Sequence, residues 1–151
     1  MIKIIAVGKI KEQYLKEAIE EYKKRLSKYT KVEIIEVASS NLDLKDKNLM
    51  IEAKKIEPLL TVKDYIVVLD INGKQMTSKE MASMIDTVFQ KYSNMTFVIG
   101  GSEGLSDEIK KKANMSFSFS KLTFPHQLFR VMLLEQIYRS YKIMNNETYH
   151  K

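Results

Sequence analysis

The sequence has 151 residues and a mass of 17.6 kDa, the size of one domain that can bury a substantial core. Apolar residues make up 44% and charged residues 29%, a balance that argues against wholesale disorder. The chain has no cysteine and two histidines. This composition excludes disulfides, thiolate metal sites and a cysteine nucleophile, and it argues against a histidine-rich metal site.

The net charge is +6, from 25 basic and 19 acidic residues, and the sequence pI is about 9.3. A compact basic protein is suited to a polyanion such as nucleic acid, although a solvated lysine-rich surface explains the charge equally well. The apolar run at the N-terminus is too short for a signal peptide, and Arg130 interrupts the longest run, Leu128–Leu134. We therefore expect a cytoplasmic protein with no membrane contact.

The first half of the chain alternates strand and helix patterns. Ile2–Val7 and Val32–Val37 are rich in β-branched residues and are predicted strands, separated by a helical stripe over residues 11–28. Ala38–Asn48 is polar and is a predicted loop. Leu49–Leu60 is a predicted helix whose last turn is weakened by Pro58.

The second half continues the alternation. The predicted strands are Tyr65–Ile71, which is followed by a predicted turn at Asn72-Gly73, then Thr96–Ile99 and Met115–Phe119. The predicted helices begin with a capping box at Thr77-Ser78-Lys79-Glu80, with Ser106, and with Pro125; the last runs to about Met144. Strands separated by helices predict a single α/β domain over residues 1–151, with a mainly parallel sheet flanked by helices.

The strongest local signal is the segment Gly100-Gly101-Ser102-Glu103-Gly104, which directly follows a predicted strand. Glycine allows close backbone approach to a ligand, and ligands of open α/β sheets lie beyond the carboxyl ends of strands. A tight connecting turn is the structural alternative. The spacing matches neither the Rossmann fingerprint nor a P-loop, which disfavours a nucleotide-dependent oxidoreductase.

The last predicted helix is apolar around most of its circumference, which predicts burial on nearly every side and favours a subunit interface. Arg130 and Arg139 interrupt this surface. Each either faces phosphate or pairs with Glu135 or another carboxylate. The ending Tyr149-His150-Lys151 is either a frayed terminus or a tail that presents base-stacking and phosphate-binding groups.

Several motifs together resemble the ribosomal RNA large subunit methyltransferase H family, of the SPOUT class, over nearly the whole chain. They are Ala6-Val7-Gly8-Lys9, Leu69-Asp70 with Gly73-Lys74, Ile99–Leu105, the segment from Ser118 to His126, Arg130-Val131, Tyr138-Arg139 and Tyr149-His150-Lys151. Ala38–Asp64 is shorter than is usual for the family, and Glu52-Ala53 replaces a common Glu-Gly pair.

The resemblance implies an α/β fold with a C-terminal trefoil knot, a homodimer, and methyl transfer from S-adenosylmethionine to N3 of a pseudouridine in 23S rRNA of the ribosome. It implies no metal. The cofactor-binding positions that it implies are Leu69, Gly100, Phe119, Ser120, Lys121, Leu122, Thr123 and Phe124. The residues expected to contact RNA are Arg130, Arg139, Tyr149, His150 and Lys151.

The proton on the target nitrogen must be accepted by a protein group or by solvent. His150 is one candidate for this catalytic role, because imidazole titrates near neutrality, and Glu103 is another. Binding or structural roles for both residues remain open. The rival hypothesis for the whole chain is a non-catalytic RNA- or ribosome-binding protein that uses the basic surface.

Overall fold

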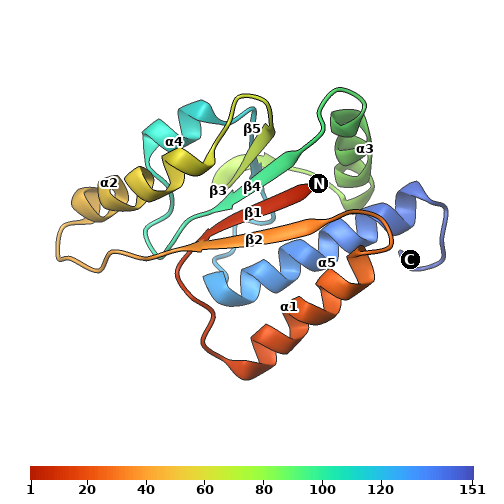
Figure 1. Ribbon diagram of the computed structural model, residues 1–151, viewed down its shortest axis with the longest axis horizontal. Helices are drawn as coiled ribbons and strands as arrows, with labels where there is room; N and C mark the ends of the chain where they lie inside the picture. The colour runs from red at the N-terminus through yellow and green to blue at the C-terminus, as the bar shows by residue number, and fades with distance from the viewer.

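The computed structural model describes residues 1–151 as a single five-stranded sheet covered by helices on both faces (Figure 1). The strands are β1 (Ile2–Val7), β2 (Val32–Val37), β3 (Tyr65–Gln75), β4 (Met95–Ile99) and β5 (Met115–Ser118). The helices are α1 (Gln13–Leu26), α2 (Lys45–Ile56), the short 3-10 helix η1 (Glu57–Leu59), α3 (Ser78–Phe89), α4 (Asp107–Lys112) and α5 (His126–Met144).

All four strand pairings are parallel, in the order β2-β1-β4-β3-β5. The predicted α/β class with a mainly parallel sheet is therefore confirmed. Helices α1, α3 and α5 cover one face of the sheet, and α2 and α4 cover the other (Figure 1). None of the helices combines the length and the apolarity required to cross a bilayer.

Two apolar cores lie on the two faces. The larger contains Ile2, Ile4 and Phe97 from the sheet, packed with Leu133 and Ile137 of α5. The smaller joins alternate residues of the same strands to α2 and α4. Because Leu133, Leu134 and Ile137 are fully buried within one chain, much of the apolar surface of α5 is used by the sheet, α1 and α3 rather than by another subunit.

Two predicted caps are confirmed. The Thr77 hydroxyl accepts from Glu80 N at 3.1 Å, and the Glu80 carboxylate accepts from Thr77 N at 2.9 Å. Ser106 Oγ accepts from Ile109 N at 3.3 Å and begins α4. Both contacts join residues three positions apart, so the sequence spacing alone reveals them.

Three predicted boundaries are wrong. Asn72-Gly73 is not a turn, because β3 continues to Gln75 through a register shift in which Leu69 and Lys74 both pair with Phe117. A Cβ at Gly73 would lie 2.7 Å from Phe117 N, so glycine permits this close approach. Helix α2 begins at Lys45, inside the predicted loop, and Pro125 is the residue before α5 rather than its first residue.

Candidate functional site

A cavity of about 430 Å³ lies at the carboxyl ends of β3, β4 and β5. Ligand sites of open parallel sheets occupy this position. Seven of the eight predicted cofactor-binding residues line it: Leu69, Gly100, Phe119, Ser120, Leu122, Thr123 and Phe124. The eighth, Lys121, belongs to the same segment but does not line the cavity.

The segment between β5 and α5 is braced by its own side chains. Ser118 Oγ donates to Ser120 O at 2.9 Å, and Ser120 Oγ accepts from Leu122 N at 3.0 Å. The Phe119 ring contacts the Phe129 ring of α5, with centroids 4.8 Å apart. These contacts hold backbone polar groups and aromatic faces along one wall of the cavity.

The opposite wall is the glycine segment. Gly104 N donates to Gly101 O at 3.1 Å, and Gly104 has a φ of +82°. A Cβ at Gly100 would lie 2.4 Å from Gly104 O, so the segment needs glycine there for its own backbone packing. Replacing Gly100 would therefore distort the loop itself, and its effect on a ligand would not be separable from that distortion.

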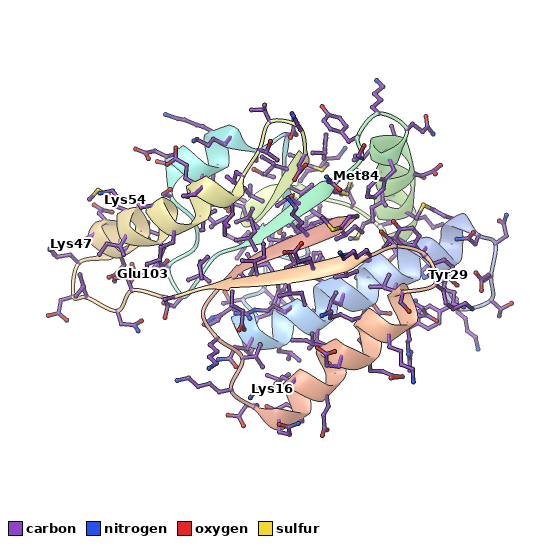
Figure 2. The ribbon with its side chains drawn as sticks, viewed as in Figure 1. Lys16, Tyr29, Lys47, Lys54, Met84 and Glu103 are labelled. Carbon is purple, nitrogen blue, oxygen red and sulfur yellow. The ribbon has the colours of Figure 1, made fainter.

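Two opposite charges at the cavity neutralise each other. Asp70 in the middle of β3 and Lys110 of α4 form an ion pair of 3.2 Å. The remaining positive charge of the chain is spread widely: Lys16 on α1 and Lys47 and Lys54 on α2 all point outward from opposite helical layers (Figure 2). The basic character is thus a property of the whole surface rather than of the cavity.

Glu103 lies between the glycine segment and α2 (Figure 2). Its Oε1 accepts from Asn48 Nδ2 at 3.1 Å, and its Oε2 is buried without a hydrogen-bond partner. Glu103 lines the cavity, but one of its carboxylate oxygens is bound by Asn48 and the other is buried, so the group is badly placed to take a proton from a substrate. The arrangement favours a structural role for Glu103, in which it ties the glycine segment to α2.

Asn48 is the other half of this tie, and it is 2% exposed. Its Oδ1 accepts from Ser40 Oγ at 2.9 Å and from Leu42 N at 2.8 Å. Its Nδ2 donates to Leu42 O at 2.8 Å as well as to Glu103. The amide therefore uses all four of its hydrogen-bonding positions, which explains why a polar residue is tolerated in this buried place.

We expect Asn48→Ala to lower the free energy of unfolding by about 1–3 kcal/mol, because buried groups in Leu42 and Glu103 would lose their partner. Urea denaturation followed by circular dichroism measures the change. Asn41→Ala is the control: Asn41 lies between Ser40 and Leu42, but its own side chain is exposed, so the change is expected to leave stability unchanged. Equal stability of the Asn48 variant and the wild type would contradict the proposed tie.

Arg130 is 1% exposed and faces the protein interior. Its Nη1 donates to Glu36 at 2.6 Å, and its Nη2 donates to Val7 O at 3.2 Å and Gly8 O at 2.7 Å. The expectation that Arg130 contacts RNA does not agree with this placement, since its guanidinium already donates to Glu36 of β2 and to the backbone carbonyls of Val7 and Gly8. Pairing with a carboxylate, the alternative interpretation, describes Arg130 correctly.

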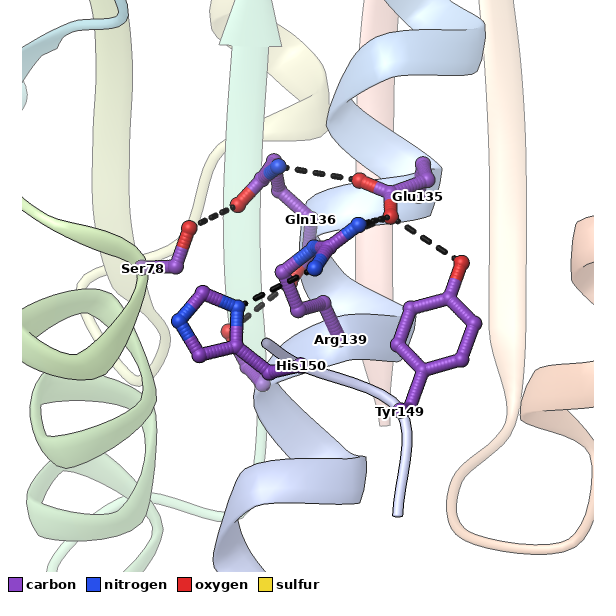
Figure 3. A network of polar contacts seen from close by, with 7 residues as sticks. Ser78, Glu135, Gln136, Arg139, Tyr149 and His150 are labelled. Carbon is purple, nitrogen blue, oxygen red and sulfur yellow. Dashed lines mark hydrogen bonds and ion pairs between the residues drawn. The ribbon is translucent and has the colours of Figure 1, made fainter.

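Arg139 is placed differently, in a network near the C-terminus (Figure 3). Its Nε and Nη2 donate to Glu135 Oε1 at 3.0 and 2.6 Å, and Tyr149 OH donates to the same oxygen at 3.1 Å. The Arg139 guanidinium also lies 4.8 Å from the centroid of the Tyr149 ring. Burial, together with the hydrogen bond to Glu135, raises the pKa of Tyr149 to about 12, so its hydroxyl stays protonated.

The same network holds one side of the His150 ring. Arg139 Nη1 lies 3.0 Å from His150 Nδ1. A guanidinium can only donate, so Nδ1 is the acceptor of this hydrogen bond and Nε2 is left on the free edge of the ring. In this arrangement the free edge of His150 is a hydrogen-bond donor, which suits binding of a carbonyl or phosphate oxygen better than removal of a proton.

The network and the cavity lie at different places along α5. Phe129 of α5 lines the cavity, and at a rise of about 1.5 Å per residue Arg139 follows about 15 Å farther along the helix. Tyr149 and His150 fold back only as far as Glu135 and Arg139. Within one chain, therefore, the structure does not bring Arg139, Tyr149 and His150 to the predicted cofactor-binding residues.

Comparison with known proteins shows to which family the chain belongs. A protein-family model described as "Predicted SPOUT methyltransferase" matches residues 1–150. The chain belongs to the SPOUT methyltransferase family.

Relatives with high similarity extend over the full length of this SPOUT chain. A "Ribosomal RNA large subunit methyltransferase H" from Caldicellulosiruptor saccharolyticus is 52% identical over 155 residues, which cover 100% of both chains. Proteins with the same name from Clostridium tetani and from Clostridium botulinum strain Kyoto are 52% and 51% identical, over 99% of each chain.

A solved structure shares the SPOUT chain's fold. "The structure of a probable methylase family protein from Haemophilus influenzae Rd KW20" superposes with a TM-score of 0.60 and 13% identity, over 99% of this chain and 70% of that chain. At this identity the likeness concerns the fold alone. The trefoil knot implied by the sequence resemblance stays a prediction.

Several residues of the SPOUT site were not singled out from the sequence. Asn48 and Glu36 act through contacts with positions distant in the chain, and no local pattern marks them. Glu135, by contrast, is a partner that the sequence already offers for the two arginines, and its position four residues before Arg139 by itself indicates an ion pair on one helical face. No three His, Asp or Glu side chains converge in the structure.

Proposed function

We propose that this SPOUT protein transfers a methyl group from S-adenosylmethionine to N3 of a pseudouridine in 23S rRNA, on the assembled ribosome. The observation that best supports this proposal is the cavity, which is lined by seven predicted cofactor-binding residues from β3, the glycine segment and the segment before α5. The names of the full-length relatives support rRNA as the substrate class. The basic surface is suited to that polyanion.

The cavity fits the proposed cofactor in size and lining. Its volume of about 430 Å³ lies within the range of small-molecule sites, which are mostly apolar with a few placed polar groups. Leu69, Phe119 and Phe124 supply apolar and aromatic surface, and backbone groups of the glycine segment and of Ser120 supply hydrogen bonds. Lys121 does not line the cavity, and we assign its side chain no contact with the cofactor.

When bound, S-adenosylmethionine supplies an electrophilic methyl carbon: its C–S bond breaks as the N3–C bond forms, and sulfur keeps the electron pair. The chain's own residues mainly position the substrate nitrogen for this displacement. Because Nε2 of His150 carries a proton and the Glu103 carboxylate is held by α2, we assign the N3 proton to water. His150, Arg139 and Tyr149 then bind and orient the nucleotide, and exposed Lys151 contacts phosphate.

This assignment requires a second chain. The tail of one chain lies beside Glu135 and Arg139, well away from its own cavity. We propose a homodimer in which the tail of one chain completes the cavity of its partner. The exposed part of α5 near the cavity, where Leu128 is 41% exposed, is the surface that we assign to this interface.

We expect Leu128→Glu to shift the protein from dimer to monomer, because a charge would be buried at the interface at a cost of about 2 kcal/mol or more. Light scattering measures the mass, which is expected to fall from twice 17.6 kDa toward 17.6 kDa. Met50→Glu is the matched control, since Met50 is 53% exposed on the opposite helical layer. A wild-type protein that is monomeric at micromolar concentration would contradict the proposal.

Isothermal titration with S-adenosylmethionine tests the cavity. Leu122 lines it and is 70% exposed, so Leu122→Ala should leave the fold intact while raising the dissociation constant about 10-fold through lost apolar contact. Val62→Ala, at a residue 96% exposed and outside the cavity, is the control and should bind as the wild type does. A chain that only binds RNA would show no saturable affinity for the cofactor.

A further inference from the structure

The C-terminal tail is a folded turn rather than a loose end. After α5 ends at Met144, Asn146 adopts a φ of 53° and is the one non-glycine residue with a positive φ. Glu147 N then donates to Lys142 O at 2.9 Å. This closes the last turn of the helix and sends Tyr149 and His150 back along α5.

The side chain of Glu147 secures this turn to two other elements. Its Oε1 accepts from Tyr29 OH at 2.7 Å, and its Oε2 accepts from Lys142 Nζ at 2.9 Å. Tyr29 follows α1, so the tail is attached to a segment 118 positions earlier in the chain. Lys142 and Tyr29 hold the pKa of the Glu147 carboxyl below its ordinary value, so it remains a charged acceptor near neutral pH.

Tyr29 is itself firmly placed. Its ring stacks on Tyr141 of α5, with centroids 5.6 Å apart and planes 20° apart. Figure 2 shows Tyr29 beside the end of α5, where the chain turns into the tail. An aromatic hydroxyl fixed by stacking is a stiff anchor, because a tyrosine has only two side-chain torsions to order.

Beyond Glu147 the tail reaches the groups assigned to the substrate. The Tyr149 ring meets buried Tyr138 edge to face, with centroids 5.0 Å apart and planes 82° apart. The Arg139 guanidinium covers the Tyr149 ring and bonds His150 (Figure 3). Glu147 contacts none of these groups directly; it fixes the backbone two residues before Tyr149 and three before His150.

We propose that Glu147, held by Tyr29 and Lys142, is a positioning residue that fixes the tail for substrate binding. The proposal rests on the proposed function, in which Tyr149 and His150 contact the nucleotide. Without this contact the tail would keep its interactions with Glu135, Tyr138 and Arg139 but lose its attachment to Tyr29, and it would sample other conformations before each productive encounter. Tyr29, which follows α1, thereby acts on the substrate site through Glu147, although it lies outside the cavity.

The test uses full-length Glu147→Ala, Glu147→Gln and Tyr29→Phe, with assembled ribosomes lacking the modification as substrate. We expect Glu147→Ala to lower kcat/KM for the ribosomes about 10-fold to 100-fold, with unchanged affinity for S-adenosylmethionine. Glu147→Gln keeps an acceptor for Tyr29 OH and is expected to recover part of the loss. Glu20→Gln, which removes an exposed carboxylate of α1, is the control and should behave as wild type.

A second readout does not depend on activity. In NMR spectra the His150 imidazole is expected to become mobile in Glu147→Ala while the thermal midpoint of the protein stays unchanged. A rigid His150 in that variant, or methylation at the wild-type rate, would overturn the proposal. If the wild type itself transfers no methyl group, the proposed function fails, and the mobility of His150 still decides whether Glu147 positions the tail.

Discussion

Replacing Arg130 by methionine is expected to lower the free energy of unfolding by about 2–4 kcal/mol, chiefly because buried backbone carbonyls lose a charged donor, whereas the Glu36 side chain is 37% exposed and stays partly solvated. The Arg130 side chain is 1% exposed, and its loss would leave Val7 O and Gly8 O without their side-chain donor. Glu36 would lose its cation while still accepting from Ile10 N at 2.9 Å. Urea denaturation followed by circular dichroism measures the change.

Arg139→Met is the matched control, since it removes a guanidinium from the same helix. Its salt bridge to Glu135 is partly exposed and joins residues four apart on one helix, a contact of about 0.5 kcal/mol. We expect this variant to unfold close to wild type but to methylate poorly, because Tyr149 and His150 lose their common neighbour. Equal stability losses in both variants would contradict the distinct roles assigned to the two arginines.

Removing Tyr149, His150 and Lys151 is expected to lower the rate of rRNA methylation about 100-fold or more, since misplacement of substrate alone costs rates of this order. The affinity for S-adenosylmethionine should not change, because none of the three residues lines the cavity. Steady-state kinetics on unmodified assembled ribosomes, together with isothermal titration, separates the two effects.

Either of two results would contradict this assignment. Methylation at the normal rate by the truncated protein would mean that the tail is only a terminus. Loss of cofactor affinity together with activity would mean that the tail supports the cavity. Mixing the truncated protein with Leu122→Ala adds a test of the shared site, because a mixed dimer contains one cavity with an intact lining and an intact tail from the partner chain.

The sequence predicts those parts of the fold that depend on neighbouring residues. The bounds of β1 and β2 follow from runs of β-branched residues, and the capping box at Thr77 and Glu80 follows from a spacing of three. The extension of β3 through Gly73 was not predictable in this way. Asn-Gly is a strong turn signal, and only the register shift against Phe117 in β5 makes this glycine a point of close strand packing.

The two arginines show the same limit at the candidate site. Arg130 and Arg139 stand on one helix in similar apolar surroundings, and their sequence context gives both the same two interpretations. What separates them is that Arg130 faces the carbonyls that end β1, whereas Arg139 faces the returning tail. Glu103 is similar, because its tie to Asn48 spans 55 positions and depends on how α2 packs against the glycine segment.

The proposed methyl transfer is tested most directly by incubating the purified protein with S-adenosylmethionine and assembled ribosomes from a strain that lacks the modification. Mass spectrometry of the 23S rRNA should find one methyl group added to N3 of a single pseudouridine, and the Arg139→Met protein should add far less. An rRNA that stays unmodified, or a methyl group on another atom, would contradict the proposed reaction.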